Sequence, residues 1–233
     1  MTTDYKAGFD YSCGEAAFAV LDKEGKVIID AFLPLNNRDA SGIPLWMEQK
    51  LKEKGLDFSD IGEWSTGSGP GSFTGLRIAS SFLMGLCFGK TEVKRRTVSS
   101  ASALAGGAAL PETAETALAL YDGRKKEILG YPLKKEDGYF CNHAGDKIRV
   151  ITRPEQAEEL AEEFDAFLIL RKDLPALEKV AGEEFARRVS VLEHVPAAEL
   201  VRFRPGVFDT GLSELAYLRP AVFVEPGKVR VLP

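Results

Sequence analysis

The chain has 233 residues, 45% of them hydrophobic, and carries 30 Lys and Arg against 35 Asp and Glu for a formal net charge of −5. This length allows one large domain or two small ones, and the acidic balance excludes a protein that binds nucleic acid alone through a broad basic face. A subunit whose partner carries the basic surface stays open. Three separated cysteines without a CxxC pair argue against a disulfide framework. No signal-peptide pattern and no apolar run of roughly 20 residues occur, so we expect a cytoplasmic protein that contacts no membrane.

The first half of the chain alternates short apolar runs with one-sided helical patterns. The residues predict strands at 5–12, 16–22 and 26–35, a helix at 44–55, a strand at 62–69, a helix at 75–89, a strand at 92–98 and a helix at 99–110. Turn chemistry from Asp22 to Gly25 joins the second and third strands, and Gly55 ends the first helix.

The second half follows the same order of elements. It predicts strands at 114–123, 125–133 and 139–151, a helix at 152–164, a strand at 165–170, and helices at 177–189 and 197–203. Asp122 and Gly123 are typical of a hairpin turn between the first two of these strands. Thr152 and Glu155 form a capping-box pattern at the start of the following helix.

Two copies of one order of elements predict a duplicated α/β fold, with a mixed sheet in each lobe and a cleft between the lobes. Gly106, Gly107 and Pro111 punctuate the chain where the copies meet. We therefore expect an N-terminal lobe at 1–105 and a C-terminal lobe at 106–233. Whether the final segment returns to the N-terminal lobe stays open.

A glycine-rich stretch at 67–77, GSGPGSFTGLR, lies between a predicted strand and a predicted helix. Free backbone N–H groups and the helix dipole at such a junction favour an anion. The candidate anion site comprises Gly69, Pro70, Gly71, Ser72, Phe73, Thr74, Gly75 and Arg77. However, no lysine follows Gly75 as in a Walker loop, and the Rossmann glycine spacing is absent. The alternative is a tight turn that lets the helix pack closely on the sheet.

Two side chains of this stretch require an explanation. Arg77 places a cation in the first helical turn, against the dipole and at a cost of roughly 0.3–1 kcal/mol. We therefore expect a compensating anion, which is a bound ligand, an internal carboxylate or an acidic partner. Phe73 is either a core plug or an anchor for a partner. The helix that follows is apolar nearly all round, which predicts either an internal core helix or a helix packed on a second chain.

The residues suggest no catalytic triad and no metal site. The chain has two histidines, His143 and His194, in neither an HExxH nor an HxxxH pattern, so we interpret both as surface or packing residues. Basic clusters occur at 94–96, 124–126 and 187–188. Such clusters are most often solvated faces, although each could touch nucleic-acid phosphates inside a complex.

The stretch GSGPGSFTGLRIA at 67–79 resembles the signature of the TsaB (YeaZ) family, the non-catalytic subunit of the bacterial tRNA threonylcarbamoyladenosine machinery. Weaker matches are FDYS at 9–12, VSSASALA at 98–105, YDGRKKEILGY at 121–131 and LSELAYLRP at 212–220. In order and spacing, the resemblance covers nearly the whole chain.

The resemblance implies a duplicated actin- and hexokinase-like (ribonuclease H-like) fold without catalytic residues. It implies a scaffold subunit that forms homodimers and pairs with the catalytic paralogue TsaD, with a TsaE-type ATPase near that junction. The complex modifies adenosine 37 of tRNA, and tRNA is expected only within it. No metal and no cofactor are expected on the isolated protein, while a nucleotide at an inter-subunit junction stays open. The implied partner interface uses the first two helices, roughly 45–54 and 75–88, and comprises Leu45, Met47, Leu51, Ile78, Phe82, Leu83 and Leu86.

Some segments depart from the family pattern. Asp10, Ser12 and Asp122 mark a candidate vestigial cleft, because relatives of this fold hold metal or phosphate there, yet Asp122 before glycine is also an ordinary turn residue. Tyr11 and Cys13 interrupt the hydroxyl-lined turn. The segment NRDASGIPL at 37–45 leaves the interface around Arg38 open. Two alternative functions remain: a small ATP-dependent phosphotransferase or ATPase of the same fold, and a metal-dependent glycoprotease.

Overall fold

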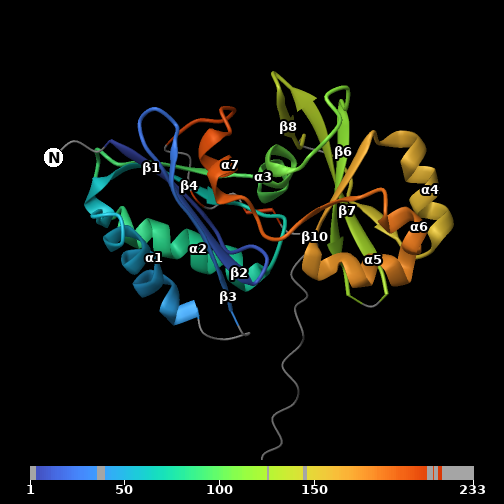
Figure 1. Ribbon diagram of the computed structural model, residues 1–233, viewed down its shortest axis with the longest axis horizontal. Helices are drawn as coiled ribbons and strands as arrows, with labels where there is room; N and C mark the ends of the chain where they lie inside the picture. The colour runs from blue at the N-terminus through green and yellow to red at the C-terminus, as the bar shows by residue number, and fades with distance from the viewer. Residues whose placement is uncertain are drawn as a thin grey trace, which may run out of the picture.

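The computed structural model describes residues 4–35, 40–124, 126–143, 146–208, 212 and 215–216. They form two lobes that lie side by side, each built on one β-sheet (Figure 1). Arg38, Lys125 and most of the segment at 212–220, which the sequence singled out, lie outside the described residues.

The N-terminal lobe contains a five-stranded mixed sheet in the order β3-β2-β1-β4-β5. Its strands are β1 (Tyr5–Asp10), β2 (Glu15–Leu21), β3 (Val27–Pro34), β4 (Ile61–Gly67) and β5 (Lys94–Val98). Strands β1 to β3 form an antiparallel meander, whereas β4 and β5 continue the sheet in parallel from β1. Two helices cover one face, α1 (Ile43–Lys52) and α2 (Phe73–Leu86), and short 3-10 turns lie at Ala40–Gly42 and Phe58–Asp60.

The C-terminal lobe repeats this topology. Its strands are β6 (Thr116–Asp122), β7 (Ile128–Glu136), β8 (Tyr139–Cys141), β9 (Arg149–Ile151), β10 (Ala166–Leu170) and β11 (Ser190–Leu192). They form the order β11-β10-β6-β7-β8, with β9 also paired to β7, and β10 and β11 run parallel to β6. The outer face carries α4 (Pro154–Glu163), α5 (Leu174–Ala181) and α6 (Glu183–Ala186), with a 3-10 turn at Arg171–Asp173. The shared strand order confirms the predicted duplicated α/β fold with a mixed sheet in each lobe.

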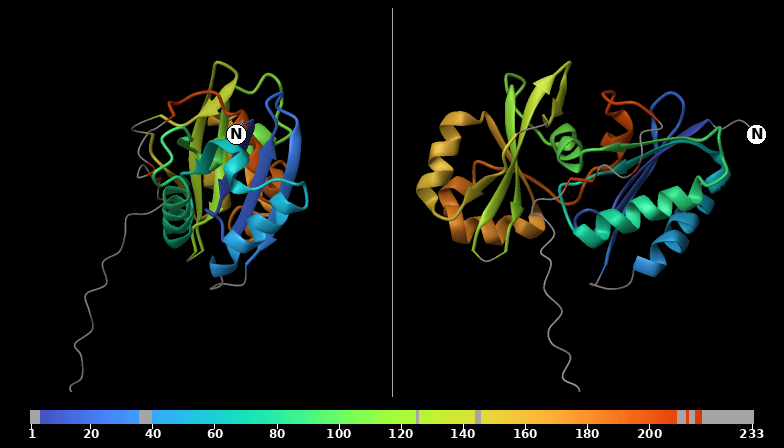
Figure 2. Two further views of the ribbon diagram at one scale, coloured as in Figure 1. Left: turned by 90° about the vertical axis from the view of Figure 1, so that its left-hand side faces the viewer. Right: turned by 180° about the vertical axis from the view of Figure 1, so that it is seen from behind.

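Two helices are exchanged between the lobes. Helix α3 (Ser100–Gly107) follows the first sheet but packs on β6, β7 and β8 of the second. Helix α7 (Ala197–Arg202) follows the second sheet but packs on β1, β2 and β4 of the first, as the right-hand view of Figure 2 shows. The core between the lobes is rich in alanine, which lets the two sheets and the two helices approach closely. Its buried alanines are Ala17, Ala19, Ala101, Ala103, Ala105, Ala114, Ala117, Ala119, Ala166, Ala197 and Ala198.

The predicted boundary between residues 105 and 106 falls inside α3. Leu212 belongs to the buried core of the N-terminal lobe, and the Ala216 amide donates to the Ser68 carbonyl of that lobe at 2.7 Å. The division of the chain at this boundary stays a prediction.

Three local predictions were wrong. The predicted strand at 139–151 is two strands, because Pro132 of β7 cannot donate to a ladder and the Asn142 side chain bonds its carbonyl at 3.0 Å instead. The predicted helix at 177–189 breaks at Gly182, where φ is +87°. The capping box does not form: α4 begins at Pro154, and the Thr152 amide and hydroxyl both donate to the Gln156 side chain, at 2.9 and 3.0 Å.

Candidate functional site

The carboxylate of Asp10 lies at the centre of the candidate site, at the end of β1, and is fully buried. It accepts hydrogen bonds from the Ser12 amide and the Ser12 hydroxyl, both at 2.7 Å, and from the Ser100 hydroxyl at 2.5 Å. Burial raises the pKa of this carboxyl, against the opposing effect of the bonds from Ser100 and Ser12. Two of the three predicted cleft residues, Asp10 and Ser12, therefore lie together.

Ser100 connects this carboxylate to the glycine loop. It is the first residue of α3, whose N-cap is Ser99. Its hydroxyl accepts from the Gly69 amide at 3.2 Å, and its amide donates to the Gly69 carbonyl at 2.6 Å. The carboxylate of Asp10 thus lies at the N-terminus of α3, where the helix dipole favours a negative charge. The N-terminus of α3 therefore has a carboxylate of the chain itself, that of Asp10, as its partner.

The glycines of the loop allow close contact with the turn between β1 and β2. A Cβ on Gly71 would lie 2.3 Å from the Ser12 carbonyl oxygen, and one on Gly75 would lie 2.0 Å from that of Tyr11. The Ser72 amide donates to the Ser12 carbonyl at 2.6 Å. These distances require glycine because real Cβ atoms do not approach a carbonyl oxygen so closely.

Four backbone amides in the loop, those of Ser68, Gly69, Ser72 and Gly75, are bonded within the chain. The Ser68 amide donates to the Val98 carbonyl at 2.8 Å, and the Gly69 and Ser72 amides have the partners given above. The Ser72 hydroxyl caps α2 by accepting from the Gly75 amide at 3.2 Å, while Pro70 is buried and Thr74 is exposed. The geometry supports the tight-turn interpretation over an open phosphate cradle, and a vestigial anion site here stays a prediction.

Arg77 stacks on Phe73. Its guanidinium carbon lies 3.6 Å from the ring centroid, one helical turn away, where the electron-rich ring face attracts a cation. Within the described ranges, no carboxylate forms an ion pair with Arg77. Phe73 is 37% exposed, so it is not the core plug that the sequence allowed.

The end of β6 does not mirror the end of β1. Asp122 is exposed and accepts from the Arg124 amide at 2.8 Å, so it is the turn residue of the β6–β7 hairpin. Tyr121 faces the core between the lobes, and its buried hydroxyl has no hydrogen-bond partner among the described residues. Beside it, the Lys172 ammonium donates to the Cys13 carbonyl and joins the lobes across the predicted cleft. Burial raises the pKa of the Cys13 thiol to about 12.

The predicted partner interface mixes buried and exposed residues. Met47, Leu51 and Leu83 are fully buried in the core of the N-terminal lobe, because they form the sheet-facing sides of α1 and α2. These three residues cannot form a surface, and their assignment to one was wrong. Ile78, Phe82 and Leu86 are half-buried against the same core, and Leu45 is 58% exposed.

The outward side of α2 is different from the predicted set. Its exposed residues recur at intervals of three or four, which places them on one side of the helix. They include Phe73, Arg77, Ser81, Met84 and, just past the helix, Phe88, while Thr74 and Gly85 are exposed beside this row. Met84 is 56% exposed and Phe88 is 87% exposed. Together with Leu45 on the neighbouring α1, these residues define the α1/α2 surface.

The histidines and basic clusters also have definite places. His143 pairs with Glu136 at 3.2 Å, and the His194 ring stacks on Phe32 with centroids 4.5 Å apart. The part of the chain that the structure describes contains no group of three or more His, Cys, Asp or Glu side chains able to hold a metal ion. None of the described helices is long and apolar enough to cross a membrane. Arg96, within a cluster interpreted as a solvated face, is instead 4% exposed.

The duplicated sheets, the exchanged helices and the closed glycine loop define the class of two-lobed actin/hexokinase-like proteins. YeaZ from Pseudomonas aeruginosa has the same fold, with a TM-score of 0.62 at 23% identity over 87% of this chain and 90% of that chain. The model of the family described as TsaD, tRNA N6-adenosine threonylcarbamoyltransferase, matches residues 38–170. The chain belongs to this family.

Two curated relatives are similar to part of the chain. The tRNA threonylcarbamoyladenosine biosynthesis protein TsaB of Escherichia coli (strain K12) is 30% identical over 109 residues, which are 47% of this chain and 46% of that protein. The TsaB protein of Haemophilus influenzae is 29% identical over 103 residues, 44% of this chain and 39% of that protein. The chain thus matches less than half the length of these relatives. Their names confirm the predicted resemblance to TsaB (YeaZ) proteins.

Proposed function

We propose that the chain is a non-catalytic scaffold and activator subunit in tRNA threonylcarbamoyladenosine biosynthesis, which acts on adenosine 37. In this proposal it forms homodimers and pairs with a TsaD-type catalytic subunit, with a TsaE-type ATPase at their junction. The observation that carries the proposal is the α1/α2 surface, where Leu45, Met84 and Phe88 expose apolar side chains to solvent. Met84 and Phe88 lie four residues apart at the end of α2, and neighbouring exposed apolar residues of this size favour protein association.

The glycine loop supports a role without chemistry of its own. Its amides at 68, 69 and 72 bond within the chain, and Asp10 is enclosed by two serines. A phosphotransferase of this fold requires phosphate-binding turns in both lobes, and the second lobe places an exposed turn aspartate at the corresponding strand end. We propose that the isolated protein binds no cofactor, and that any nucleotide lies at an inter-subunit junction.

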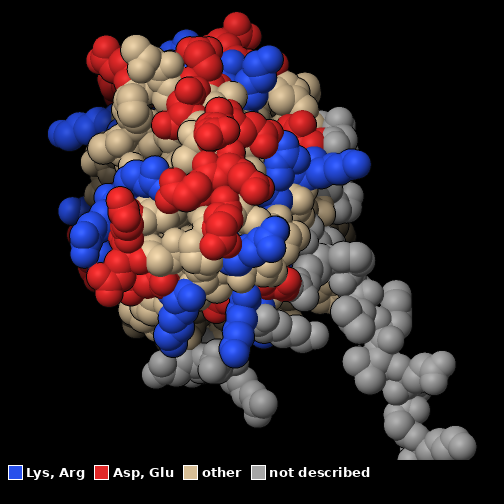
Figure 3. Space-filling model, turned by 90° about the vertical axis from the view of Figure 1, so that its right-hand side faces the viewer, with Lys and Arg blue, Asp and Glu red and all other residues tan. Residues whose placement is uncertain are grey.

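The charge distribution supports tRNA contact only within the complex. Acidic side chains gather on the outer end of the C-terminal lobe, where α4 lies (Figure 3). Exposed glutamates of α4 are Glu155, Glu158, Glu159, Glu162 and Glu163. This face repels the phosphate backbone, so a partner must supply the basic surface. We place the protein in the cytoplasm with no membrane contact.

Sedimentation of the chain alone and with the TsaD-type protein of its source tests the proposal. We expect self-association and a mixed complex at concentrations on the order of 10 μM, typical of transient assemblies. Two independent species at ten times that concentration would contradict it. Calorimetry with ATP and Mg²⁺ covers the alternative, because micromolar binding by the isolated chain would favour an ATPase.

A further inference from the structure

Helix α7 packs on the first sheet across a single row of cross-strand residue partners. Gly8 of β1 pairs with Ala19 on one side and with Ser65 on the other, and Ser65 pairs with Arg96 of β5. A Cβ on Gly8 would lie 2.1 Å from the Ala197 carbonyl oxygen, so α7 rests directly on the backbone of β1. Small residues in the middle of the row therefore let the helix approach the sheet closely. Arg96 is the residue of this row on the edge strand β5.

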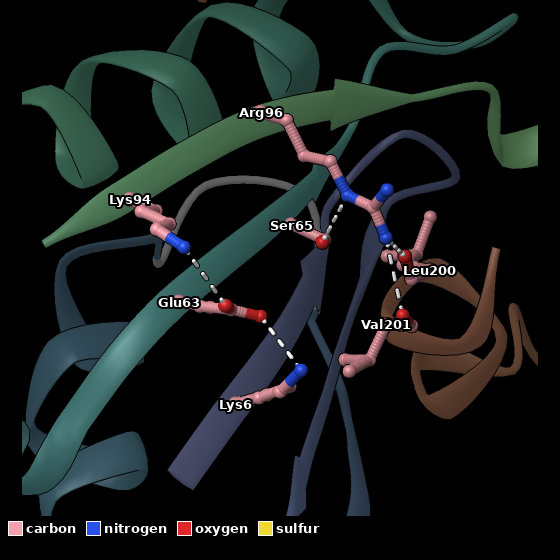
Figure 4. A network of polar contacts seen from close by, with 7 residues as sticks. All are labelled: Lys6, Glu63, Ser65, Lys94, Arg96, Leu200 and Val201. Atoms are coloured by element: carbon pink, nitrogen blue, oxygen red, sulfur yellow. Dashed lines mark hydrogen bonds and ion pairs between the residues drawn. The ribbon is translucent and has the colours of Figure 1, made fainter. Parts of the chain in front are cut away.

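Arg96 reaches from this row to the C-terminal end of α7. Its Nε donates to the Ser65 hydroxyl at 2.9 Å, and its Nη2 donates to the carbonyls of Leu200 and Val201 at 3.2 and 3.1 Å (Figure 4). Both carbonyls lie in the last turn, where a helix leaves its carbonyl groups without partners of its own. A cation at this position also complements the negative end of the helix dipole.

The charge of Arg96 is compensated by its hydrogen bonds to Ser65 and to the α7 carbonyls. Glu63 lies two residues before Ser65 on β4 and on the same face of the sheet. Its carboxylate forms ion pairs with Lys6 at 3.0 Å and Lys94 at 3.7 Å (Figure 4). In the described part of the chain, no carboxylate forms an ion pair with Arg96. The Phe208 ring covers the guanidinium, with its centroid 4.7 Å from Cζ. Burial lowers the pKa of Arg96, with Glu63 opposing, yet an arginine stays charged.

Helix α7 depends on such outside support. It has six residues, and its N-cap, Pro196, provides no side-chain hydrogen bond. A helix this short is unstable alone, because the few hydrogen bonds formed do not offset nucleation. The helix arrives from the second lobe, so whatever fixes it to the first sheet also joins the two halves of the chain.

We propose that Arg96 is a positioning residue that fastens α7, and with it the second half of the chain, onto the first lobe. Its two bonds to the α7 carbonyls hold the helix, and Ser65 orients the guanidinium for them. The fastening is a property of the fold and does not rest on the proposed function.

Hydrogen exchange followed by mass spectrometry tests the fastening in the full chain. In Arg96→Met, which keeps the apolar stem, we expect amides of α7 to exchange at least about tenfold faster, with α4 to α6 unchanged. Arg96→Lys should give a smaller increase, since one ammonium cannot reproduce the forked geometry. Lys94→Met, an exposed residue two positions earlier on the same face, is the control and should leave α7 unchanged.

Unchanged exchange of α7 in Arg96→Met would overturn the proposal, as would an equal increase throughout the chain, which indicates general destabilisation. If Arg96→Met does not fold, Ser65→Ala provides the second test. It removes only the acceptor for Nε, and the expected result is faster exchange confined to α7. Exchange in Ser65→Ala equal to that of the unmodified chain would overturn the proposal.

Discussion

The Asp10 carboxylate accepts a 2.5 Å hydrogen bond from the hydroxyl of Ser100, which lies 90 residues further along the chain. This bond joins the end of β1 to the start of α3, and the same serine binds both backbone groups of Gly69. The glycine loop is therefore organised around a side chain of the protein itself. The Gly69 amide thus donates to the Ser100 hydroxyl, which Asp10 holds in place, and its partner lies within the chain.

The stability contribution of Asp10 should depend on pH in a defined direction. Burial raises the pKa of Asp10 in the folded protein above its ordinary value of 3.8. A raised pKa means that the folded state holds the proton more tightly, so the contribution is complete below about pH 4 and is lost as the pH rises through the folded pKa. We expect the free energy of unfolding of the unmodified chain, relative to Asp10→Asn, to fall across this range in denaturation at several pH values.

Asp165 provides the matched comparison with the opposite sign. Its carboxylate accepts from the amides of Glu115 and Thr116, both at 2.9 Å, and these bonds lower its pKa. Its contribution is therefore present above about pH 4 and is lost as the pH falls through the folded pKa. Asp165→Asn should cost more at neutral than at acidic pH. The same slope for both variants would refute the assignment of Asp10.

Alanine substitutions in the loop should separate the packed glycines from an ordinary one. Gly75→Ala and Gly71→Ala place a Cβ against carbonyl oxygens at 2.0 and 2.3 Å, so each should destabilise the chain by about 1–3 kcal/mol. Gly85→Ala, in the same helix with nothing within 4 Å of its Cβ, should stabilise by about 0.5–1 kcal/mol. Urea denaturation measures all three. Equal effects at Gly75 and Gly85 would show that close packing does not explain the loop.

Cys13 should react slowly with alkylating agents. Burial raises its pKa from 9.0 to about 12, which lowers the thiolate fraction at pH 8 by about a thousandfold. A less acidic thiolate is a better nucleophile, so we expect alkylation by iodoacetamide to be about 10- to 100-fold slower than in the unfolded chain. Peptide mass spectrometry resolves Cys13 from Cys87 and Cys141. Equal rates for Cys13 in the folded and unfolded chains would contradict the raised pKa of this half-buried thiol.

Charges on the α1/α2 surface should disrupt association without unfolding the chain. Met84→Glu and Phe88→Glu alter side chains that are 56% and 87% exposed, so each should weaken self-association by at least about tenfold in sedimentation. Val150→Glu, which is 47% exposed on β9 of the other lobe, is the control and should associate normally. Association that survives both α2 variants would place the interface elsewhere. A charge at buried Leu83 tests only folding.

The duplicated order of strands could be read from the sequence because apolar runs, hairpin turns and capped helices are local signals. The hydrogen bonds that close the glycine loop could not be predicted from the sequence. Gly69 bonds Ser100 and Ser68 bonds Ala216, and both partners are far away in the chain. Local patterns also do not separate the inner from the outer side of an apolar helix. For this reason Met84 and Phe88 were not singled out within the predicted interface helices, while the buried Met47 and Leu83 were.

The burial of Arg96 was not predicted because two other basic residues precede it in the sequence. Three basic residues in a row, 94–96, are typical of a solvated face, yet alternation in β5 places Arg96 on the same side as buried Val98. That alternation is the signal that could have identified an inward-facing cation. Its partners, the carbonyls of α7, follow from tertiary structure and leave no trace in the local sequence.

Transfer of the threonylcarbamoyl group to tRNA in a reconstituted system tests the central claim most directly. The TsaD- and TsaE-type proteins of the same source are combined with the remaining component of the reaction, a TsaC-type protein, with and without this chain, and modified adenosine is quantified by mass spectrometry. We predict transfer only when the chain is present, with Val150→Glu active and Phe88→Glu strongly reduced. Equal yields in the presence and absence of the chain would contradict its assignment as the activating subunit.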